Sequence, residues 1–219
     1  MKTEPEIREP LTRERIVEAA LRVMDADGLE AVTMRRLGRE LGVEAMSLYN
    51  HVEDKDALLR GALARVLSEF ELPQDPDLDW IERVRQMART FRELLLRHPG
   101  VIPLLSEKSG PITDPRALVP IETALQTLRD GGLSEAETIH AYRAVVGFVV
   151  GSVALEVAGF LNPGDAGASH LEEMAAAIPL ERFPRIVGLL PAMHDCDPAQ
   201  EFEHGLDLLL TGLRSRVDR

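Results

Sequence analysis

Polar side chains suited to nucleic-acid contacts gather between residues 47 and 55 of the chain. Four neighbours carry hydroxyl, amide or imidazole groups that form hydrogen bonds: Ser47, Tyr49, Asn50 and His51. A tyrosine hydroxyl can donate to a DNA phosphate, and an asparagine amide can pair with the edge of an adenine. Lys55 lies in the first turn of the next expected helix, where free N–H groups already favour an anion. The segment therefore predicts contacts with DNA.

Two short helices and a glycine turn are expected to position these groups. The apolar spacing predicts helices at about 34–41 and 44–50, and Gly42 between them takes a positive φ without steric cost. A helix, a short glycine-containing turn and a second helix form a helix-turn-helix, whose second helix enters the major groove. The first of the two helices adds a local basic stripe: Arg35, Arg36 and Arg39. The alternative is a small helical hairpin with ordinary solvent-facing polar groups.

The composition limits the class of protein. The chain has 219 residues, with 25 basic and 37 acidic side chains and a net charge of −12. Hydrophobic residues make up 45% and charged residues 28%, which is typical of a soluble globular protein and excludes a disordered tail or a collagen-like fibre. The acidic balance also excludes a broadly basic nucleic-acid coat, so DNA contacts must come from a local patch.

Helical periodicity extends over almost the whole chain, and no strand with clean alternation stands out. Residues 13–27 form the first amphipathic helix, and Pro73, Asp75 and Pro76 break the pattern later. Ser134 and Glu137 fit a capping box that opens a long helix. We therefore predict an all-α protein with a three-helix DNA-binding head at 11–56 and a larger helical body at 57–219.

The chain offers little for disulfide or membrane chemistry. Cys196 is the sole cysteine, which excludes an intrachain disulfide and a zinc site built from several cysteines. The N-terminus lacks the apolar region of a signal peptide. The most apolar run, Ala144 to Leu155, is shorter than the roughly 20 residues of a membrane span. We expect a cytoplasmic protein without a membrane partner.

The stretch from Val32 to Leu59, with the runs LGRELGV, SLYNHV and DKDALL, resembles the tetracycline-repressor (TetR) family of bacterial transcriptional regulators. The first helix, with RIVEAA at 15–20 and Gly28 after it, fits the opening of the same family. The resemblance implies DNA-binding positions at Arg35, Ser47, Tyr49, His51 and Lys55, and we include Thr33, which also fits the family opening. Asn50, which we add to them, departs from the family, because an aromatic residue often stands there.

The body resembles this family in its long helix after Ser134. In the family, that helix and the last one form a four-helix dimer interface. Gly147 and Gly151, four residues apart, permit close approach of another helix, and the last helix carries an apolar stripe: Phe202, Leu206, Leu209 and Leu213. The resemblance therefore implies a homodimer that buries both sets. The alternative is that both stripes pack inside one chain.

The family's body also binds a small effector between its helices. Candidate pocket residues are Trp80, Met87, Phe91, Tyr142 and Arg143. The alternative for the apolar ones is plain core, and Arg143 has the alternative of pairing with an acidic neighbour. Tetracycline repressors hold a magnesium–drug complex through a histidine just after the fifth helix, but residues 101–108 contain none. We therefore expect no tetracycline, no cofactor and no metal site, and interpret residues 194–197 (HDCD) as a solvated loop.

No enzyme motif is present: there is no glycine-rich phosphate loop, no GxSxG and no HExxH. The sequence therefore predicts a non-enzymatic, ligand-responsive regulator. We expect a repressor that a small organic effector releases from an inverted-repeat operator in double-stranded DNA. The alternative is a helical scaffold or adaptor without sequence-specific DNA binding.

Overall fold

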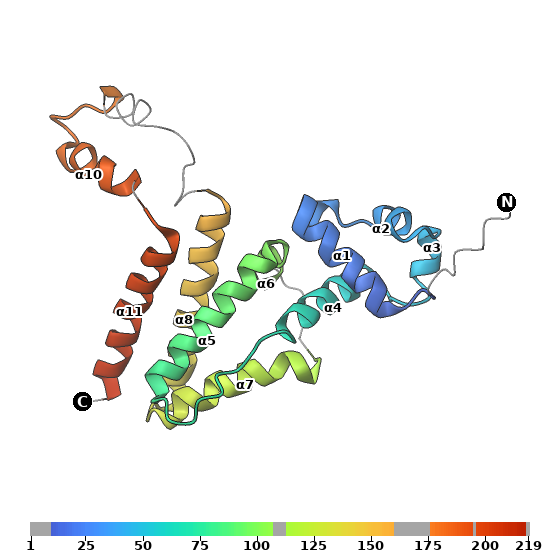
Figure 1. The fold of residues 1–219 in the computed structure, drawn as a ribbon, viewed down its shortest axis with the longest axis horizontal. Helices are drawn as coiled ribbons and strands as arrows, with labels where there is room; N and C mark the ends of the chain where they lie inside the picture. Colours follow the sequence, from blue (N-terminus) through green and yellow to red (C-terminus); the bar gives the residue numbers. More distant parts are fainter. Residues whose placement is uncertain (1–9, 107–112, 160–175, 195, 218–219) are drawn as a thin grey trace, which may run out of the picture. The chain divides into compact units, whose positions relative to one another are not determined.

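The computed structural model describes residues 10–106, 113–159, 176–194 and 196–217 (Figure 1). All regular elements in these ranges are helices, which confirms the predicted all-α class. The chain divides into two compact units. Unit 1 comprises residues 1–71 and 97–121, and unit 2 comprises residues 72–96 and 122–219.

Unit 1 begins with four helices that follow the predicted pattern closely. These are α1 (Arg13–Asp27), α2 (Met34–Leu41), α3 (Ala45–Leu48) and α4 (Lys55–Leu67), with a 3-10 turn at Leu29–Ala31. The side chains of Thr12, Thr33 and Asp54 each accept a hydrogen bond from a backbone N–H three residues later. Such caps satisfy N–H groups that the first helical turn leaves free, so each helix begins where its capping residue stands.

The head is held together by apolar side chains that its helices turn inward. The fully buried members include Ile16, Met24, Leu37, Leu48 and Leu58. They come from all four helices, so α2 and α3 are fixed against α1 and α4 by a shared core. Figure 1 shows α1 and α4 packed along each other within this unit.

A second stretch of chain completes unit 1. It contains the 3-10 turn Pro99–Val101, helix α6 (Ile102–Ser106) and the start of α7 (Pro115–Asp130). Val101 and Leu104 are buried. Gly100 lies so close to α1 that an added Cβ would be 2.6 Å from the backbone carbonyl of Met24. The head is therefore a compact body built from two distant segments of sequence.

Unit 2 contains most of α5 (Trp80–Arg97), the end of α7, α8 (Glu135–Val157), α10 (Pro184–His194) and α11 (Pro198–Val217). Helices α8 and α11 run side by side (Figure 1), with Phe148 and Phe202 stacked at 5.4 Å between ring centroids. The predicted capping box at Ser134 and Glu137 is present at the start of α8. Ser169 and Glu172 have the spacing of a second capping box, but they lie outside the described residues.

Helix α8 is longer and more apolar than its twelve-residue central run suggests. Its 23 residues include an 18-residue window with mean hydropathy 1.5, enough by length and composition to cross a membrane. Only 22% of that window is buried. Length and composition alone also select core helices of soluble proteins, so one such helix is weak evidence of a membrane span, and most of this window is left uncovered by the described part of the chain.

Candidate nucleic-acid interface and body sites

The turn between α2 and α3 is built around two glycines. Gly42 has a φ of 67°, the left-handed conformation that glycine adopts without steric cost. At Gly38, an added Cβ would lie 2.9 Å from the carbonyl oxygen of Val43 and 3.1 Å from the backbone N of Ala45. Any side chain at position 38 would therefore push α2 and α3 apart. This geometry gives the predicted helix-turn-helix.

The second helix of the motif is shorter than predicted. Regular α3 covers Ala45–Leu48, and turns continue it, with hydrogen bonds from Tyr49 N–H to the Met46 carbonyl and from His51 N–H to the Leu48 carbonyl. Leu48 is completely buried and fixes the rotation of this segment. The opposite side therefore faces away from the core of the head.

The predicted DNA-binding side chains of residues 47–55 differ in exposure. Tyr49, Asn50 and His51 are exposed, and Ser47 and Lys55 are half-buried. Within the described part of the head, the side chains of Asn50 and Tyr49 form no hydrogen bond, although both carry groups suited to DNA. Exposed hydrogen-bonding groups thus follow α3 directly, and Lys55 begins the next helix, α4.

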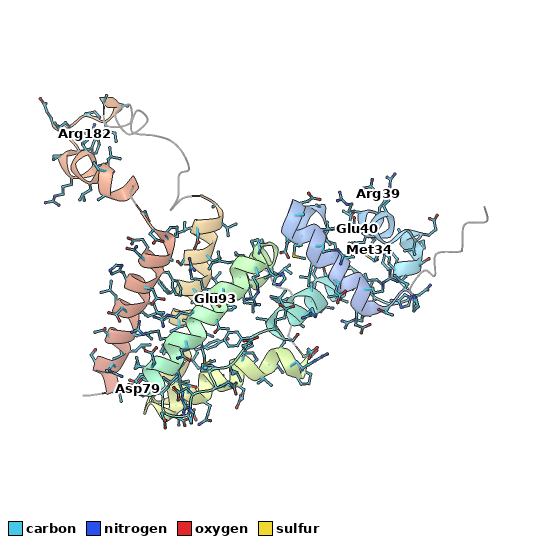
Figure 2. All side chains as sticks on the ribbon, viewed as in Figure 1. Met34, Arg39, Glu40, Asp79, Glu93 and Arg182 are labelled. Carbon is cyan, nitrogen blue, oxygen red and sulfur yellow. The ribbon has the colours of Figure 1, made fainter. Side chains whose placement is uncertain are left out.

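The basic stripe on α2 is less uniform than the sequence suggests. Arg36 pairs with Asp27 at the end of α1, with 3.1 Å between nitrogen and carboxylate oxygen. Arg35 and Arg39 are exposed, and Arg39 projects from α2 next to Glu40 (Figure 2). Thr33, expected among the DNA contacts, uses its hydroxyl to accept a hydrogen bond from the Arg36 N–H at 3.1 Å. Its visible role is to begin α2.

One exposed residue of the motif escaped the sequence reasoning. Met46 is 74% exposed on α3, beside the polar candidates. The signal lay in the pattern itself, because Met46 falls two residues before the core position Leu48 and so lies on the other side of the helix.

A second cluster in unit 1 connects α1 to the turn after α5. The His98 Nδ1 lies 2.9 Å from an Asp25 carboxylate oxygen, and its Nε2 lies 3.4 Å from an oxygen of Glu69. The other Asp25 oxygen accepts a hydrogen bond from the Gly100 N–H at 3.2 Å. This cluster, the His98 clamp (Asp25, Glu69, His98 and Gly100), ties the turn to the ends of α1 and α4.

The predicted effector residues have different surroundings. Met87 is buried, and Phe91 and Tyr142 are half-buried. Burial raises the pKa of the Tyr142 hydroxyl, so this group stays protonated at neutral pH. Trp80 packs against the end of α7, since a Cβ added at Gly131 would lie 2.4 Å from its indole ring. Trp80 therefore packs the start of α5 against the end of α7.

Arg143 does not fit the expected pocket position. Helix α8 buries Thr138, Ala141, Val149 and Val153, and Arg143 lies on another side of the helix, where it is exposed. Solvent therefore stabilises its charge, and its expected place in an effector pocket stays a prediction.

A cavity of about 570 Å³ opens in unit 1, and none of the five predicted effector residues lines it. Its walls come from α1, α4 and the start of α7, and its lining residues are Arg13, Ala57, Arg60, Gly61, Ala64, Thr113, Asp114, Pro115 and Arg116.

The apolar stripe of the last helix turns mostly inward. Phe202, Leu206 and Leu213 are buried within this chain, as the alternative of packing inside one chain expects, and their part in a dimer interface stays a prediction. Phe202 stacks on Phe148 and also lies under the Arg92 guanidinium, 5.2 Å from the ring centroid. Leu209 is half-buried at the margin of this core.

Three glycines of α8 and α11 leave open space beside their helices. Among the described residues, none has a heavy atom within 4 Å of a Cβ added at Gly147 or Gly151 on α8 or at Gly212 on α11, outside the helix's own backbone. Leu208 is 78% exposed. We call Gly147, Gly151, Leu208 and Gly212 the outer face of the body.

Ion pairs join α5 to its neighbours inside unit 2. Arg89 makes two hydrogen bonds of 2.7 Å to the Glu203 carboxylate, and Arg92 pairs with Glu156 at 2.6 Å. The hydrogen bonds from Arg89 hold the pKa of Glu203 below its ordinary value. These contacts fix α5 against both α8 and α11.

Within the described ranges, no group of three metal-binding side chains comes together. Cys196 is a free thiol, and slight burial with nearby Glu201 and Asp197 raises its pKa. The side chains of His194 and Asp195, the other members of the predicted solvated loop, lie outside the described residues.

Two family models match the chain. One, described as "Bacterial regulatory proteins, tetR family", covers residues 16–62, and the other, "Tetracyclin repressor-like, C-terminal domain", covers residues 72–217. The HTH-type transcriptional repressor DrrR1 of Streptomyces coeruleorubidus is 34% identical over 214 residues, which span 94% of this chain and 78% of the relative. The class D tetracycline repressor protein of Escherichia coli is 30% identical over 211 residues, 94% and 91% of the two chains.

Solved structures have the same fold as this chain over almost its whole length. Apo ActR from Streptomyces coelicolor superimposes with a TM-score of 0.81 at 30% identity, covering 96% of this chain and 98% of that one. ActR in complex with actinorhodin gives a TM-score of 0.80 at 32% identity, covering 96% and 100%.

Proposed function

Because the chain belongs to the TetR family of bacterial transcriptional regulators, we propose that it is a cytoplasmic homodimer released from an inverted-repeat operator by a small organic effector. Family membership establishes a soluble, non-enzymatic transcriptional repressor, as the sequence predicted, and excludes the scaffold alternative. The likeness to ActR over head and body together supports the finer proposals, which are the homodimer, the operator and the small effector.

In the proposed complex with DNA, the segment of α3 and its following turns lies in the major groove. Tyr49, His51 and Lys55 contact phosphates, which position the head without reading sequence. Asn50 pairs with an adenine edge, and Arg35 and Ser47 extend the contact. Thr33 acts indirectly, since its hydroxyl holds the first turn of α2. The exposure of Arg35, Tyr49, Asn50 and His51 supports this arrangement.

The proposed dimer uses the outer face of the body. Gly147, Gly151 and Gly212 leave room for a neighbouring helix, and a second copy would cover Leu208, which the described part of this chain leaves 78% exposed. Four helices, α8 and α11 from each copy, would then bury this surface. Leu209 lies at its edge. Two heads in such a dimer would dock about one helical turn of DNA apart, or roughly 35 Å.

The proposed effector site lies in the body, near Met87, Phe91 and Tyr142. Apolar walls with a few polar groups are typical of small-molecule sites, and the protonated Tyr142 hydroxyl supplies a donor. The complexes of ActR with actinorhodin and with (S)-DNPA support a small-molecule site in a chain of this fold. The division of head and body at residues 56 and 57 stays a prediction, and the family models leave residues 63–71 between them unmatched.

The proposed coupling runs along α5 to the His98 clamp. Helix α5 carries Met87 and Phe91 and ends at Arg97, immediately before His98 in the chain. A displacement of α5 by the effector would therefore move His98 against Asp25 and Glu69, at the ends of α1 and α4. Such couplings between two sites amount to about 1–3 kcal/mol.

Selection of bound fragments from a random duplex library tests the proposed DNA contacts. The selected duplex should contain an inverted repeat, and the double variant Tyr49→Ala/Lys55→Ala should bind all duplexes more weakly and with a reduced salt dependence. Arg182→Ala is the matched control, because it also removes a positive charge but from the turn before α10 (Figure 2). Unchanged affinity of the double variant, with its fold intact, would exclude the placement of α3 in the groove.

A further inference from the structure

Met46 has an unusual position for an apolar side chain. Leu48, two residues later on α3, is completely buried, and residues of a helix are about 100° apart around its axis. Met46 therefore points roughly opposite to the core of the head. Its side chain is 74% exposed, although methionine normally gains from burial.

The exposure of Met46 is high in comparison with that of the other large hydrophobic side chains. Among the described residues only Leu208 is more exposed, at 78%, and it lies on the outer face of the body proposed to meet a second copy. Met46 lies instead between Ser47 and the N-terminus of α3, on the segment that carries Tyr49 and Asn50. A residue on that segment meets the floor of the groove when the head docks, because the N-terminal residues of a recognition helix contact base edges.

The major groove offers an apolar side chain one kind of partner. Base edges present hydrogen-bond donors and acceptors, and the only methyl group is the C5 methyl of thymine. Methionine is flexible and polarizable, so its thioether can follow the contour of that methyl. From the exposure of Met46 and its place on α3, we propose that Met46 is a specificity-determining residue that reads a thymine methyl in each half-site.

The position of Asn50 predicts which base pair lies near the thymine that Met46 contacts. It follows Met46 by four residues, on the turn that continues α3. The Asn50 N–H donates to the Ser47 carbonyl, three residues earlier, at 3.3 Å, which holds Asn50 close to the end of α3. Asn50 pairs with adenine and Met46 with thymine, so each half-site has neighbouring A·T base pairs under these two side chains.

Deoxyuridine scanning tests the inference, which rests on the proposed placement of α3 in the groove. Each thymine of the duplex selected by the wild-type protein is replaced singly, in both half-sites, by deoxyuridine, which lacks only the methyl. We expect one symmetric pair of positions to lower wild-type affinity by about fourfold per half-site, or about fifteenfold for both, the factor for one buried methyl group each.

Variants of Met46 assign the effect to this side chain. Met46→Gln, similar in length but polar, should bind the thymine and deoxyuridine duplexes equally, whereas Met46→Leu should keep the preference for thymine. Asn50→Ala should also keep it while losing its own preference for adenine. The melting temperature of each variant should match that of the wild type, because position 46 contributes little to the core.

Two results would overturn the inference in distinguishable ways. If the wild type tolerates deoxyuridine everywhere, or Met46→Gln retains the full penalty, while Tyr49→Ala/Lys55→Ala still weakens binding, then α3 lies in the groove but Met46 does not read thymine. If the Tyr49→Ala/Lys55→Ala variant binds as tightly as the wild type, the placement of α3 itself is wrong, and the inference fails with it.

Discussion

Replacing Gly100 with alanine would place a methyl group where α1 already stands. The new Cβ would lie 2.6 Å from the carbonyl carbon and oxygen of Met24 and from its Cγ. The side chain can rotate away, but the carbonyl cannot, because its oxygen accepts the N–H of Gly28 at 2.9 Å and closes the end of α1. The turn at Pro99–Val101 must therefore move.

The size of this effect can be estimated from the contacts involved. Overpacking of a well-packed site costs about 1–3 kcal/mol. Movement of the turn also lengthens the hydrogen bond from Gly100 N–H to Asp25 and the contact of His98 with the same carboxylate, which adds about 1 kcal/mol. We expect the free energy of unfolding to fall by about 2–4 kcal/mol. Gly100 does not have a positive φ, so backbone strain adds nothing to this cost.

Urea unfolding followed by circular dichroism measures the change, with equal protein concentrations because dimers unfold in a concentration-dependent way. Gly188→Ala is the matched control. Gly188 lies in α10 with no heavy atom within 4 Å of an added Cβ, and alanine there should stabilise by up to about 1 kcal/mol. If Gly100→Ala and Gly188→Ala unfold at the same urea concentration, the close approach of the turn to α1 is refuted.

Four further outcomes are expected. Thr33→Ala should lower the free energy of unfolding by about 1 kcal/mol in thermal melts while Thr33→Ser restores it, because the hydroxyl caps α2; equal melting of all three would contradict this role. Gly151→Leu should yield monomer in sedimentation, since its own chain leaves the site free; a stable dimer at micromolar concentration would exclude the proposed interface. Arg89→Gln should destabilise by less than about 1 kcal/mol at pH 7, because this half-exposed pair is screened by solvent. The pKa of Glu203 is lowered when folded, so that difference should shrink as the pH falls below 4.5, and a constant difference in pH-dependent melts would count against the pair. Phe91→Ala should change the response to small molecules in binding assays while ligand-free DNA affinity stays nearly constant; loss of both would indicate a core role.

Local signals in the sequence predicted the helix starts well. Ser134 caps α8 as predicted, and Thr12 and Asp54 cap α1 and α4 in the same way, because a cap depends only on the next three residues. Gly42 likewise has the positive φ that the helix-turn-helix requires. The all-α class followed from the same short-range periodicity.

Partners of a helix face were harder to predict. The stripe of Phe202, Leu206 and Leu213 has the same spacing whether it meets its own chain or a second one, and only the packing of α11 on α8 identifies the partner. Asp25 and His98 are 73 residues apart, and no periodicity connects two positions at that distance. Arg143 and Met46 depended on the rotation of their helices, which buried neighbours fix.

The two-segment composition of unit 1 sets a condition for hybrid regulators. An engineer who joins this DNA-reading half to a foreign sensing half would naturally cut once, after α4. That cut would discard residues 97–121, which belong to the same compact unit. The end of α1 would lose the cover of Val101 and Leu104, and Asp25 would lose His98. A transferred head therefore needs both of its segments, residues 1–71 and 97–121, and a single cut in the sequence cannot separate it from the body.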